Sequence, residues 1–319
     1  MKELFKNQNS FMTGRDPFVM IKGVEVGAGS WGSEIVFENH HEGFIGIPHG
    51  GVAMGLCLDL WRNLPGAQYP VKVSFRFAGT GISIGDKAIL EVEGASGFDQ
   101  QSRAIKITKL GDRKPYLTAT FKPLDDDFCE SPSSMPSNEF RPLPYYKNCL
   151  VCGHHRAVVG LKRQFRYHEV GQDKMVTVVW GQNDEDLDRA KFFLIGENEL
   201  HPFVLIAIFD ENTAWGGFME TRRGGLSVKL DFLIRRPVQS TEKLLFIGRP
   251  AGIRGASSSP RFFSARGEIL SLSDPKSPEV VAHGWGEWVV LKQYTEQIRN
   301  NLIPKSDVEW LFGPYGQQK

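Results

Sequence analysis

One sequence pattern occurs twice in this chain, over residues 49–61 and over residues 201–215. Each copy begins with a histidine, continues as an almost wholly apolar run and ends with a tryptophan. Apart from Gly55 and Asp59, the first copy is apolar on every side, which is typical of a buried helix. The chain is therefore expected to contain two copies of one unit, each built around a buried helix.

Alternation of apolar and polar residues predicts strands before and after each of these helices. In the first half the predicted strands cover residues 33–37, 71–77, 88–93, 103–110 and 116–122. In the second half they cover residues 160–167, 175–180, 228–234, 262–270 and 283–291. The repeated order predicts an α+β fold in which each unit is a strongly curved antiparallel sheet wrapped around its helix.

The amino-acid composition changes between the two halves of the sequence. Residues 124–146 are rich in aspartate, proline and serine and show little apolar periodicity, which is typical of a surface linker. The predicted organisation is an N-terminal domain over residues 1–123, this linker, and a C-terminal domain over residues 147–319 with a short helical tail. A chain of 319 residues is long enough for two such domains.

Composition argues against several classes of protein. The net charge is +1 and no block of Lys and Arg is present, so a nucleic-acid partner is not expected. The first residues lack the long apolar core of a signal peptide, and no run approaches the roughly 20 apolar residues of a spanning helix. We therefore expect a soluble, cytoplasmic protein that does not insert into membranes.

Two of the four cysteines, Cys149 and Cys152, have the spacing of a zinc knuckle. A structural zinc site needs a second pair of ligands, which the following His154 and His155 could supply, although such pairs usually come from further along the chain. The preferred interpretation is a turn with small side chains packed beneath it. No metal site is predicted.

Several motifs together resemble the hotdog-fold acyl-CoA thioesterases, especially those of the phenylacetate-pathway type. The motifs are IPHGGV at 47–52, NCLVCG at 148–153 with GL at 160–161, FDENTAW at 209–215 and GWGEWVVL at 284–291. The likeness extends over about residues 23–291. It implies two tandem hotdog domains that form an internal pseudo-dimer, a small-molecule acyl thioester as substrate, and a possible homodimer. It implies no cofactor beyond the coenzyme A that the substrate carries.

The chemistry of thioester hydrolysis gives the first repeat a role. The attacked carbonyl becomes an oxyanion, which needs preorganised N–H donors. A helix start offers free N–H groups and the positive end of the dipole, and the N–H of Gly50 is the expected donor. The alternative is that Gly50 and Gly51 merely let the chain turn and the helix pack.

The reaction also needs a carboxylate that activates water or attacks the carbonyl itself. Asp210 is the candidate because an aspartate in an apolar helix is costly to bury without a task or a partner. The resemblance places the acid nine residues after the histidine, which selects Asp210 over Glu211. In the alternative, Asp210 is a structural carboxylate satisfied by the backbone or by Arg222 or Arg223.

The resemblance also implies that the site lies between the two units, with the N–H from one and the acid from the other. One site then combines Gly50 with Asp210. The other would combine Pro202, which has no N–H, with Leu58, because Asp59 points about 100° away along its helix. The second site is predicted to be inactive.

Three further assignments are open in the sequence. His49 either orients its turn by hydrogen bonding or acts as an acid–base group. Thr213 either holds the attacking water or bonds back to a helix carbonyl. Arg222 and Arg223 are the candidates for binding the phosphates of coenzyme A.

Two other functions are compatible with these residues. A hotdog hydratase or dehydratase acting on an acyl thioester would use His49 as the base and Asp210 or Glu211 as the acid. A non-catalytic acyl-CoA-binding protein would use the same cleft without chemistry. Thioester hydrolysis is the leading expectation.

Overall fold

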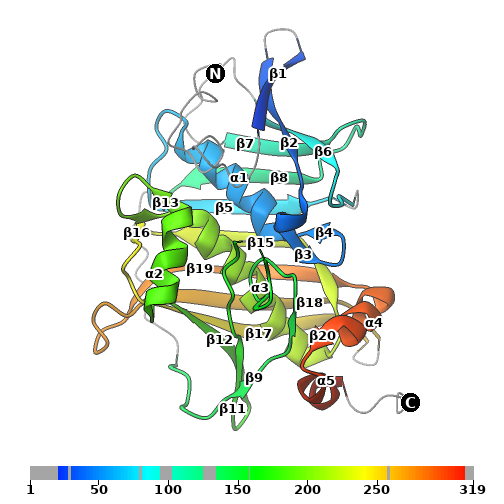
Figure 1. Ribbon diagram of the computed structural model, residues 1–319, viewed down its shortest axis with the longest axis vertical. Coiled ribbons are helices and arrows are strands. Elements are labelled where there is room, and N and C mark those ends of the chain that lie inside the picture. Colours follow the sequence, from blue (N-terminus) through cyan, green and yellow to red (C-terminus); the bar gives the residue numbers. More distant parts are fainter. Residues whose placement is uncertain are drawn as a thin grey trace.

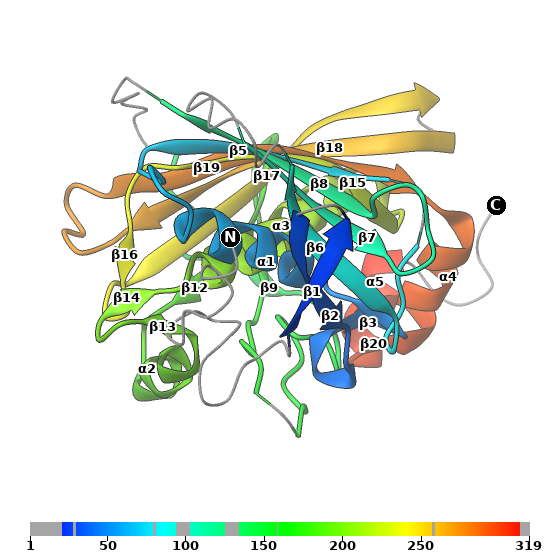
Figure 2. The same cartoon turned by 90° about the horizontal axis from the view of Figure 1, so that it is seen from above.

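The computed structural model describes residues 21–27, 30–78, 81–93, 103–124, 134–157, 159–256 and 259–312. Two long helices, α1 (Gly50–Arg62) and α3 (Pro202–Thr221), lie on one face of a large antiparallel sheet (Figure 1). Seen from above, the sheet forms a curved layer over both helices (Figure 2). The described helices also include α2 (Asp184–Ala190), α4 (Lys292–Asn301) and α5 (Lys305–Phe312).

The large sheet contains thirteen of the described strands. One half of the sheet has, in spatial order, β1 (Ile21–Gly27), β2 (Ser30–Val36), β6 (Lys87–Glu93), β7 (Arg103–Lys109), β8 (Leu117–Pro123) and β5 (Val71–Phe77). The order continues with β15 (Gly225–Ile234), β19 (Glu279–Val290), β18 (Ser259–Ser271), β17 (Leu244–Ala256), β12 (Asp173–Trp180), β11 (Arg166–Val170) and β9 (Arg141–Pro142). The two halves meet where β5 pairs with β15.

This junction shows why the alternating segments became strands. In β5 the side chains of Val71, Val73 and Phe75 are fully buried, whereas Lys72 and Arg76, which alternate with them, are exposed. The apolar face of the strand therefore covers the helices while its polar face meets solvent. The predicted α+β arrangement, a curved antiparallel sheet around one helix in each half, is confirmed.

The two helices touch at small residues. An ideal Cβ added at Gly51 would lie 2.5 Å from the Cα of Ala207, and one added at Gly55 would lie 2.6 Å from Cδ2 of Phe203. Any side chain at these two positions would force the helices apart. Glycine therefore lets the start of α1 pack directly against α3.

Two of the predicted elements differ most from the structure. Residues 160–165 are not a strand: the N–H groups of Leu161 and Arg163 donate to carbonyls of the turn at residues 149–152, and Lys162 has a left-handed φ of 50°. Helix α3 continues to Thr221, past two consecutive glycines, Gly216 and Gly217, which lie against the sheet.

Short strands complete the described structure. They form the pairs β3 (Glu42–Phe44) with β4 (Ile47–Pro48) and β10 (Tyr145–Tyr146) with β20 (Leu302–Ile303), and the group β13 (Leu194–Ile195), β14 (Glu199–Leu200) and β16 (Val238–Gln239). The short 3-10 helices are η2 (Asn39–His41) and η3 (Lys191–Phe193). Among the described helices, none combines the length and apolar character that crossing a bilayer requires.

The end of the predicted linker packs with the second half of the protein. Strand β9 pairs with β11, and the side chains of Leu143 and Tyr146 are buried. These apolar residues follow the polar stretch, so burial of their side chains draws the last part of the linker onto the sheet. Residues 125–133 lie outside the described part of the chain.

Candidate active site

A cavity of about 340 Å³ lies where the start of α1 faces the middle of α3. Gly50, the first residue of α1, and Asp210, on α3, both line it. An ideal Cβ added at Gly50 would lie 3.1 Å from Oδ2 of Asp210, so the two groups are next to each other. The fold thus brings together the two residues that the sequence analysis paired across the halves.

Asp210 is buried, with 6% of the residue exposed. Its Oδ1 accepts a hydrogen bond from the Ser227 hydroxyl at 3.0 Å. Burial raises the pKa of the Asp210 carboxyl above its usual value, the nearby His49 and the Ser227 hydrogen bond act in the opposite direction, and Glu211 adds to the rise. A carboxylate in this setting is a stronger proton acceptor than an ordinary aspartate.

Ser227 was not among the candidates from the sequence. It lies in β15, and its hydroxyl reaches Asp210 on α3. No local motif marks it, since a serine in a strand is ordinary. A hydrogen bond between a strand and a helix depends on how the two elements pack.

His49 is the N-cap of α1. Its Nδ1 accepts a hydrogen bond from the Gly51 N–H at 2.9 Å, so in the neutral ring Nε2 carries the proton. That Nε2 lies 3.3 Å from Oε2 of Glu211 and donates to it. Both ring nitrogens are engaged, which matches the orienting role of His49 rather than the acid–base one.

The same carboxylate oxygen of Glu211, Oε2, accepts a second hydrogen bond. The thiol of Cys149 donates to Oε2 at 3.2 Å, and burial raises the pKa of this thiol, which keeps it protonated. Cys149 and Cys152 form the expected turn beside the cavity. The turn therefore helps to fix the carboxylate that neighbours Asp210.

The ligand atoms of His49, Cys149 and Glu211 all lie within 4.8 Å of one another, as in many metal sites. A histidine that binds a metal through Nε2 carries its proton on Nδ1. In this protein Nδ1 of His49 accepts the capping hydrogen bond from Gly51. The donor set therefore does not fit a metal ion as long as His49 caps the helix.

The structure removes Thr213 from the candidate site. Its side chain is fully buried, it does not line the cavity, and its hydroxyl donates to the carbonyl of Phe209 at 2.6 Å. This is the back-bonding alternative, in which a threonine satisfies its hydroxyl on the preceding helical turn. Thr213 is therefore not exposed to the cavity in which the proposed reaction takes place.

A second pair of a histidine and an acid, equivalent to His49 and Glu211, lies in the interior of the protein. His201 caps α3 through the N–H of Phe203, and its Nε2 donates to Oδ1 of Asp59 at 3.0 Å. His201 and Asp59 are fully buried, as is Leu58. None of these three residues lines the cavity.

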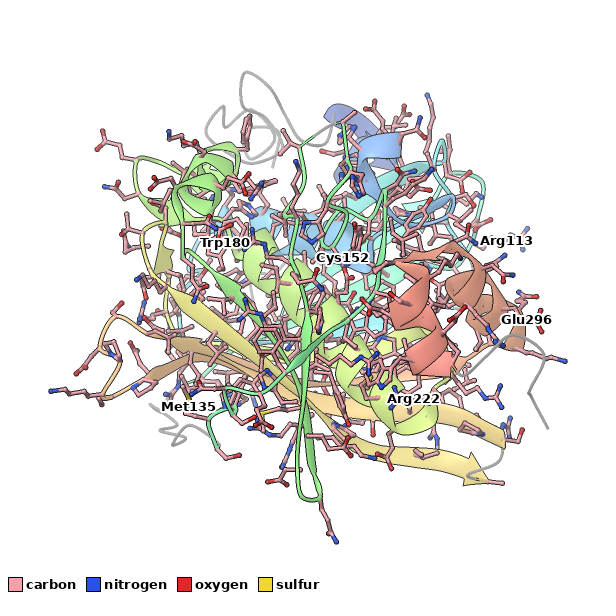
Figure 3. All side chains as sticks on the ribbon, turned by 60° about the horizontal axis from the view of Figure 1, so that its bottom comes forward. Arg113, Met135, Cys152, Trp180, Arg222 and Glu296 are labelled. Atoms are coloured by element: carbon pink, nitrogen blue, oxygen red, sulfur yellow. The ribbon has the colours of Figure 1, made fainter. Side chains whose placement is uncertain are left out.

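The two arginines assigned to coenzyme A phosphates do not line the cavity. Arg222 ends α3 in a left-handed conformation, and its guanidinium lies over the Trp310 ring, 5.4 Å from the centroid. Figure 3 shows Arg222 near the end of α3, away from Cys152. Arg223 immediately precedes Gly224, a lining residue. The phosphate-binding role of both arginines remains a prediction, and the observed partner of Asp210 is Ser227.

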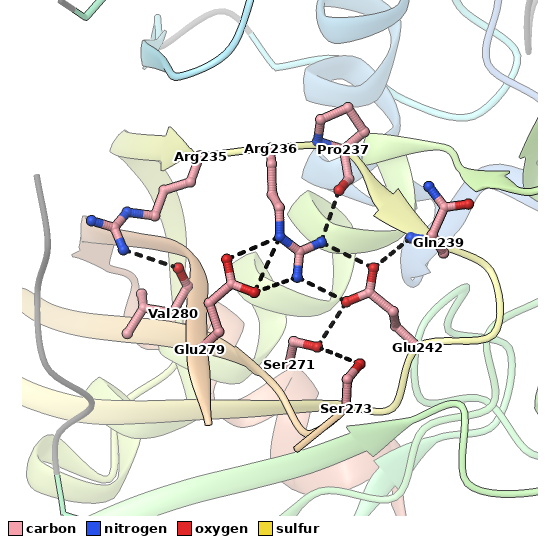
Figure 4. A network of polar contacts seen from close by, with 9 residues as sticks. All are labelled: Arg235, Arg236, Pro237, Gln239, Glu242, Ser271, Ser273, Glu279 and Val280. Atoms are coloured by element: carbon pink, nitrogen blue, oxygen red, sulfur yellow. Dashed lines mark hydrogen bonds and ion pairs between the residues drawn. The ribbon is translucent and has the colours of Figure 1, made fainter. Parts of the chain in front are cut away.

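Another arginine pair, Arg235 and Arg236, directly follows β15 and forms polar contacts with neighbouring residues (Figure 4). Arg236 forms ion pairs with Glu242 at 3.0 Å and with Glu279 at 2.6 Å. The hydrogen bonds from Arg236 lower the pKa of Glu279. These contacts fix the end of the strand, and Arg235, Arg236 and their partners do not line the cavity.

No family model matches the sequence, and no curated protein is significantly similar to it. Solved structures do resemble the fold. The tesB protein from Mycobacterium avium subsp. paratuberculosis matches with a TM-score of 0.53 at 12% identity, over 85% of this chain and 96% of that one. A proposed thioesterase from Novosphingobium aromaticivorans matches with a TM-score of 0.52 at 12% identity, over 84% and 98%.

The dehydratase domain of PpsC from Mycobacterium tuberculosis, solved in complex with C12:1-CoA, matches with a TM-score of 0.50 at 12% identity, over 85% of this chain and 97% of that domain. At this level of identity the matches establish architecture. The sheet order, the two enclosed helices and these matches together show that the chain has a hotdog fold, with two hotdog units in tandem.

Proposed function

We propose that this protein hydrolyses an acyl thioester, such as an acyl-CoA, at the cavity between its two hotdog units. The observation that carries the proposal is the juxtaposition of Gly50 and Asp210, which places a helix N-terminus beside a buried carboxylate with a raised pKa. The two groups come from different halves of the chain. The similarity in fold to a proposed thioesterase from Novosphingobium aromaticivorans supports the same activity.

In the proposed reaction the thioester carbonyl accepts a hydrogen bond from the Gly50 N–H. The positive end of the α1 dipole then stabilises the oxyanion that forms on attack. Asp210 takes a proton from water as the water oxygen bonds to the carbonyl carbon. The carbon–sulfur bond breaks, the proton passes to the leaving thiolate, and a carboxylic acid and a thiol are released.

Three residues position this machinery. Ser227 donates to Oδ1 of Asp210 and leaves Oδ2 directed towards Gly50. His49 caps α1 and thereby fixes the direction of its first N–H groups. Glu211, which accepts from His49, ties the start of α1 to the helix that carries Asp210.

The direct test is a thiol-release assay against a panel of acyl-CoA substrates. The wild-type protein should release free thiol, and Asp210→Asn should lose at least 100-fold in kcat while still binding the substrate. Hydrolysis by the variant near the wild-type rate would overturn the assignment of Asp210. A single turnover in ¹⁸O-labelled water distinguishes the two roles of Asp210, because a nucleophilic carboxylate would itself acquire the label.

The hydratase or dehydratase alternative needs His49 as a base. The geometry argues against that role, since Nδ1 of His49 accepts from Gly51 and Nε2 donates to Glu211. A hydration assay on an enoyl-CoA tests this alternative directly. Binding of acyl-CoA without thiol release or hydration would instead support a non-catalytic binding protein.

A further inference from the structure

The C-terminal segment, residues 292–312, forms one wall of the cavity. Tyr294, Ile298 and Leu302 line the cavity, and all three follow β19, the last strand of the second hotdog unit. The segment consists of α4, β20 and α5, and it lies beside the end of α3 (Figure 1). The sheet and the two central helices therefore leave one side of this cavity for an added element to close.

This wall is held in place by specific contacts. Strand β20 pairs with β10, so that Leu302 lies opposite Tyr146. The Gly224 N–H donates to the Thr295 hydroxyl at 2.9 Å, and an ideal Cβ at Gly224 would lie 2.4 Å from Cδ1 of Ile298. The Ile298 side chain therefore packs closely against Gly224, in the short connection between α3 and β15.

The two ends of the cavity differ in exposure. Among the lining residues, Ala78 and Gly81, which follow Phe77 in the chain, are exposed, whereas Phe218 and Leu302 are only 4% and 3% exposed. The Phe77 ring connects the open end to the reacting groups, because its Cζ would lie 3.6 Å from a Cβ at Gly50. An apolar acyl group suits the closed end, and the polar thiol carrier can remain at the open end.

The helix gives the length of the closed part. Asp210 and Phe218 both line the cavity from α3, and eight residues of helix span about 12 Å. An extended hydrocarbon advances about 1.3 Å per carbon, so about eight to ten carbons fill this distance. We propose that the substrate carries a medium-length apolar acyl chain and that Ile298 and Leu302 of the C-terminal segment set its maximum length. This inference rests on the proposed thioesterase function.

The test is the chain-length profile of kcat/KM for saturated acyl-CoA substrates of two to sixteen carbons. The wild-type optimum should lie at about eight to ten carbons. Ile298→Ala removes three carbons from the wall, so the optimum should move about two to three carbons longer, and Ile298→Trp should move it shorter. Leu270→Ala, at a fully buried position of β18 that does not line the cavity, should leave the profile unchanged.

Profiles of both Ile298 variants that superimpose on the wild-type profile would overturn the proposal, as would a longer optimum in Leu270→Ala. Affinities for S-alkyl thioethers of coenzyme A, measured by calorimetry, separate this proposal from the proposed hydrolysis. If no thioester is hydrolysed but the preferred alkyl length still shifts in the two Ile298 variants, the proposed hydrolysis is wrong. The proposal that the C-terminal segment limits chain length is then still supported. Affinities that do not depend on alkyl length would contradict the proposal that the C-terminal segment limits the length of the bound chain.

Discussion

Oδ1 of Asp59 accepts a hydrogen bond from Nε2 of His201 at 3.0 Å, and this pair reproduces the contact between Glu211 and His49 in the other half of the protein. In each half the capping histidine of one helix binds an acid on the other helix. Asp59 is therefore the counterpart of Glu211, and the counterpart of Asp210 is Leu58. This relationship separates a structural pair from the proposed catalytic acid.

Asp59→Asn should lower stability without changing the chemistry. The side chain is fully buried, and weakening its bond to His201 should cost about 1–3 kcal/mol of unfolding free energy. Urea denaturation measures the loss, and kcat per folded molecule should stay within a few-fold of wild type. A large loss of turnover in fully folded protein would show that the second helix start contributes to the reaction.

Gly50→Pro should abolish hydrolysis while preserving the fold. Proline is favoured at the first position of a helix, as Pro202 shows in α3, but it has no N–H to stabilise an oxyanion. We expect kcat to fall about 100- to 1000-fold with helical circular dichroism retained.

The matched control is Pro202→Gly, which restores an N–H at the start of α3. Its rate should stay within a few-fold of wild type, because Leu58 supplies no carboxylate there. An unchanged kcat in Gly50→Pro, with Pro202→Gly also unchanged, would remove Gly50 from the proposed mechanism.

Ser227→Ala should move the pH dependence of the reaction. The Ser227 hydrogen bond lowers the pKa of Asp210 against the effect of burial, so its removal raises that pKa further. The base acts when ionised, and the acidic limb of the kcat/KM profile should therefore shift to higher pH. An acidic limb that stays in place would mean that Asp210 is not the group whose ionisation controls the rate.

Relative to wild type, the Asp210→Asn variant should be more stable at neutral pH than it is at acidic pH. The native pKa of Asp210 is raised above its unfolded value of about 3.9, so the native state holds this proton more tightly than the unfolded state does. The contribution of Asp210 to stability is greatest below the unfolded pKa. It falls as pH rises through the native pKa and is constant above it.

Thermal unfolding of wild type and Asp210→Asn, compared from pH 3 to pH 8, measures this difference. As pH rises from the unfolded pKa of Asp210 to its native pKa, the melting temperature of the variant should increase relative to that of wild type. A gap that is the same at every pH would show that burial of the charged Asp210 carries no energetic cost.

Local residues were enough to predict much of the architecture. The alternation in residues 71–77 matches β5, and the apolar run after His49 matches α1 within two residues at its start. The strand predicted at residues 160–167 was wrong over its first six residues, because these residues bond to the turn that contains Cys149. Competition between a sheet and a neighbouring turn depends on packing and leaves no mark in a short alternating segment.

The sequence by itself determined which helix start carries an N–H and on which side of its helix each acid lies. The covalent structure of proline and the 3.6-residue turn of the α-helix fix both properties at Pro202 and Asp59, whatever surrounds them. Tertiary structure alone decided that Ser227 meets Asp210, that Cys149 meets Glu211 and that the C-terminal segment closes the cavity. Each of these contacts joins segments that are separate along the chain, and the packing of the sheet on its helices sets the distances between them.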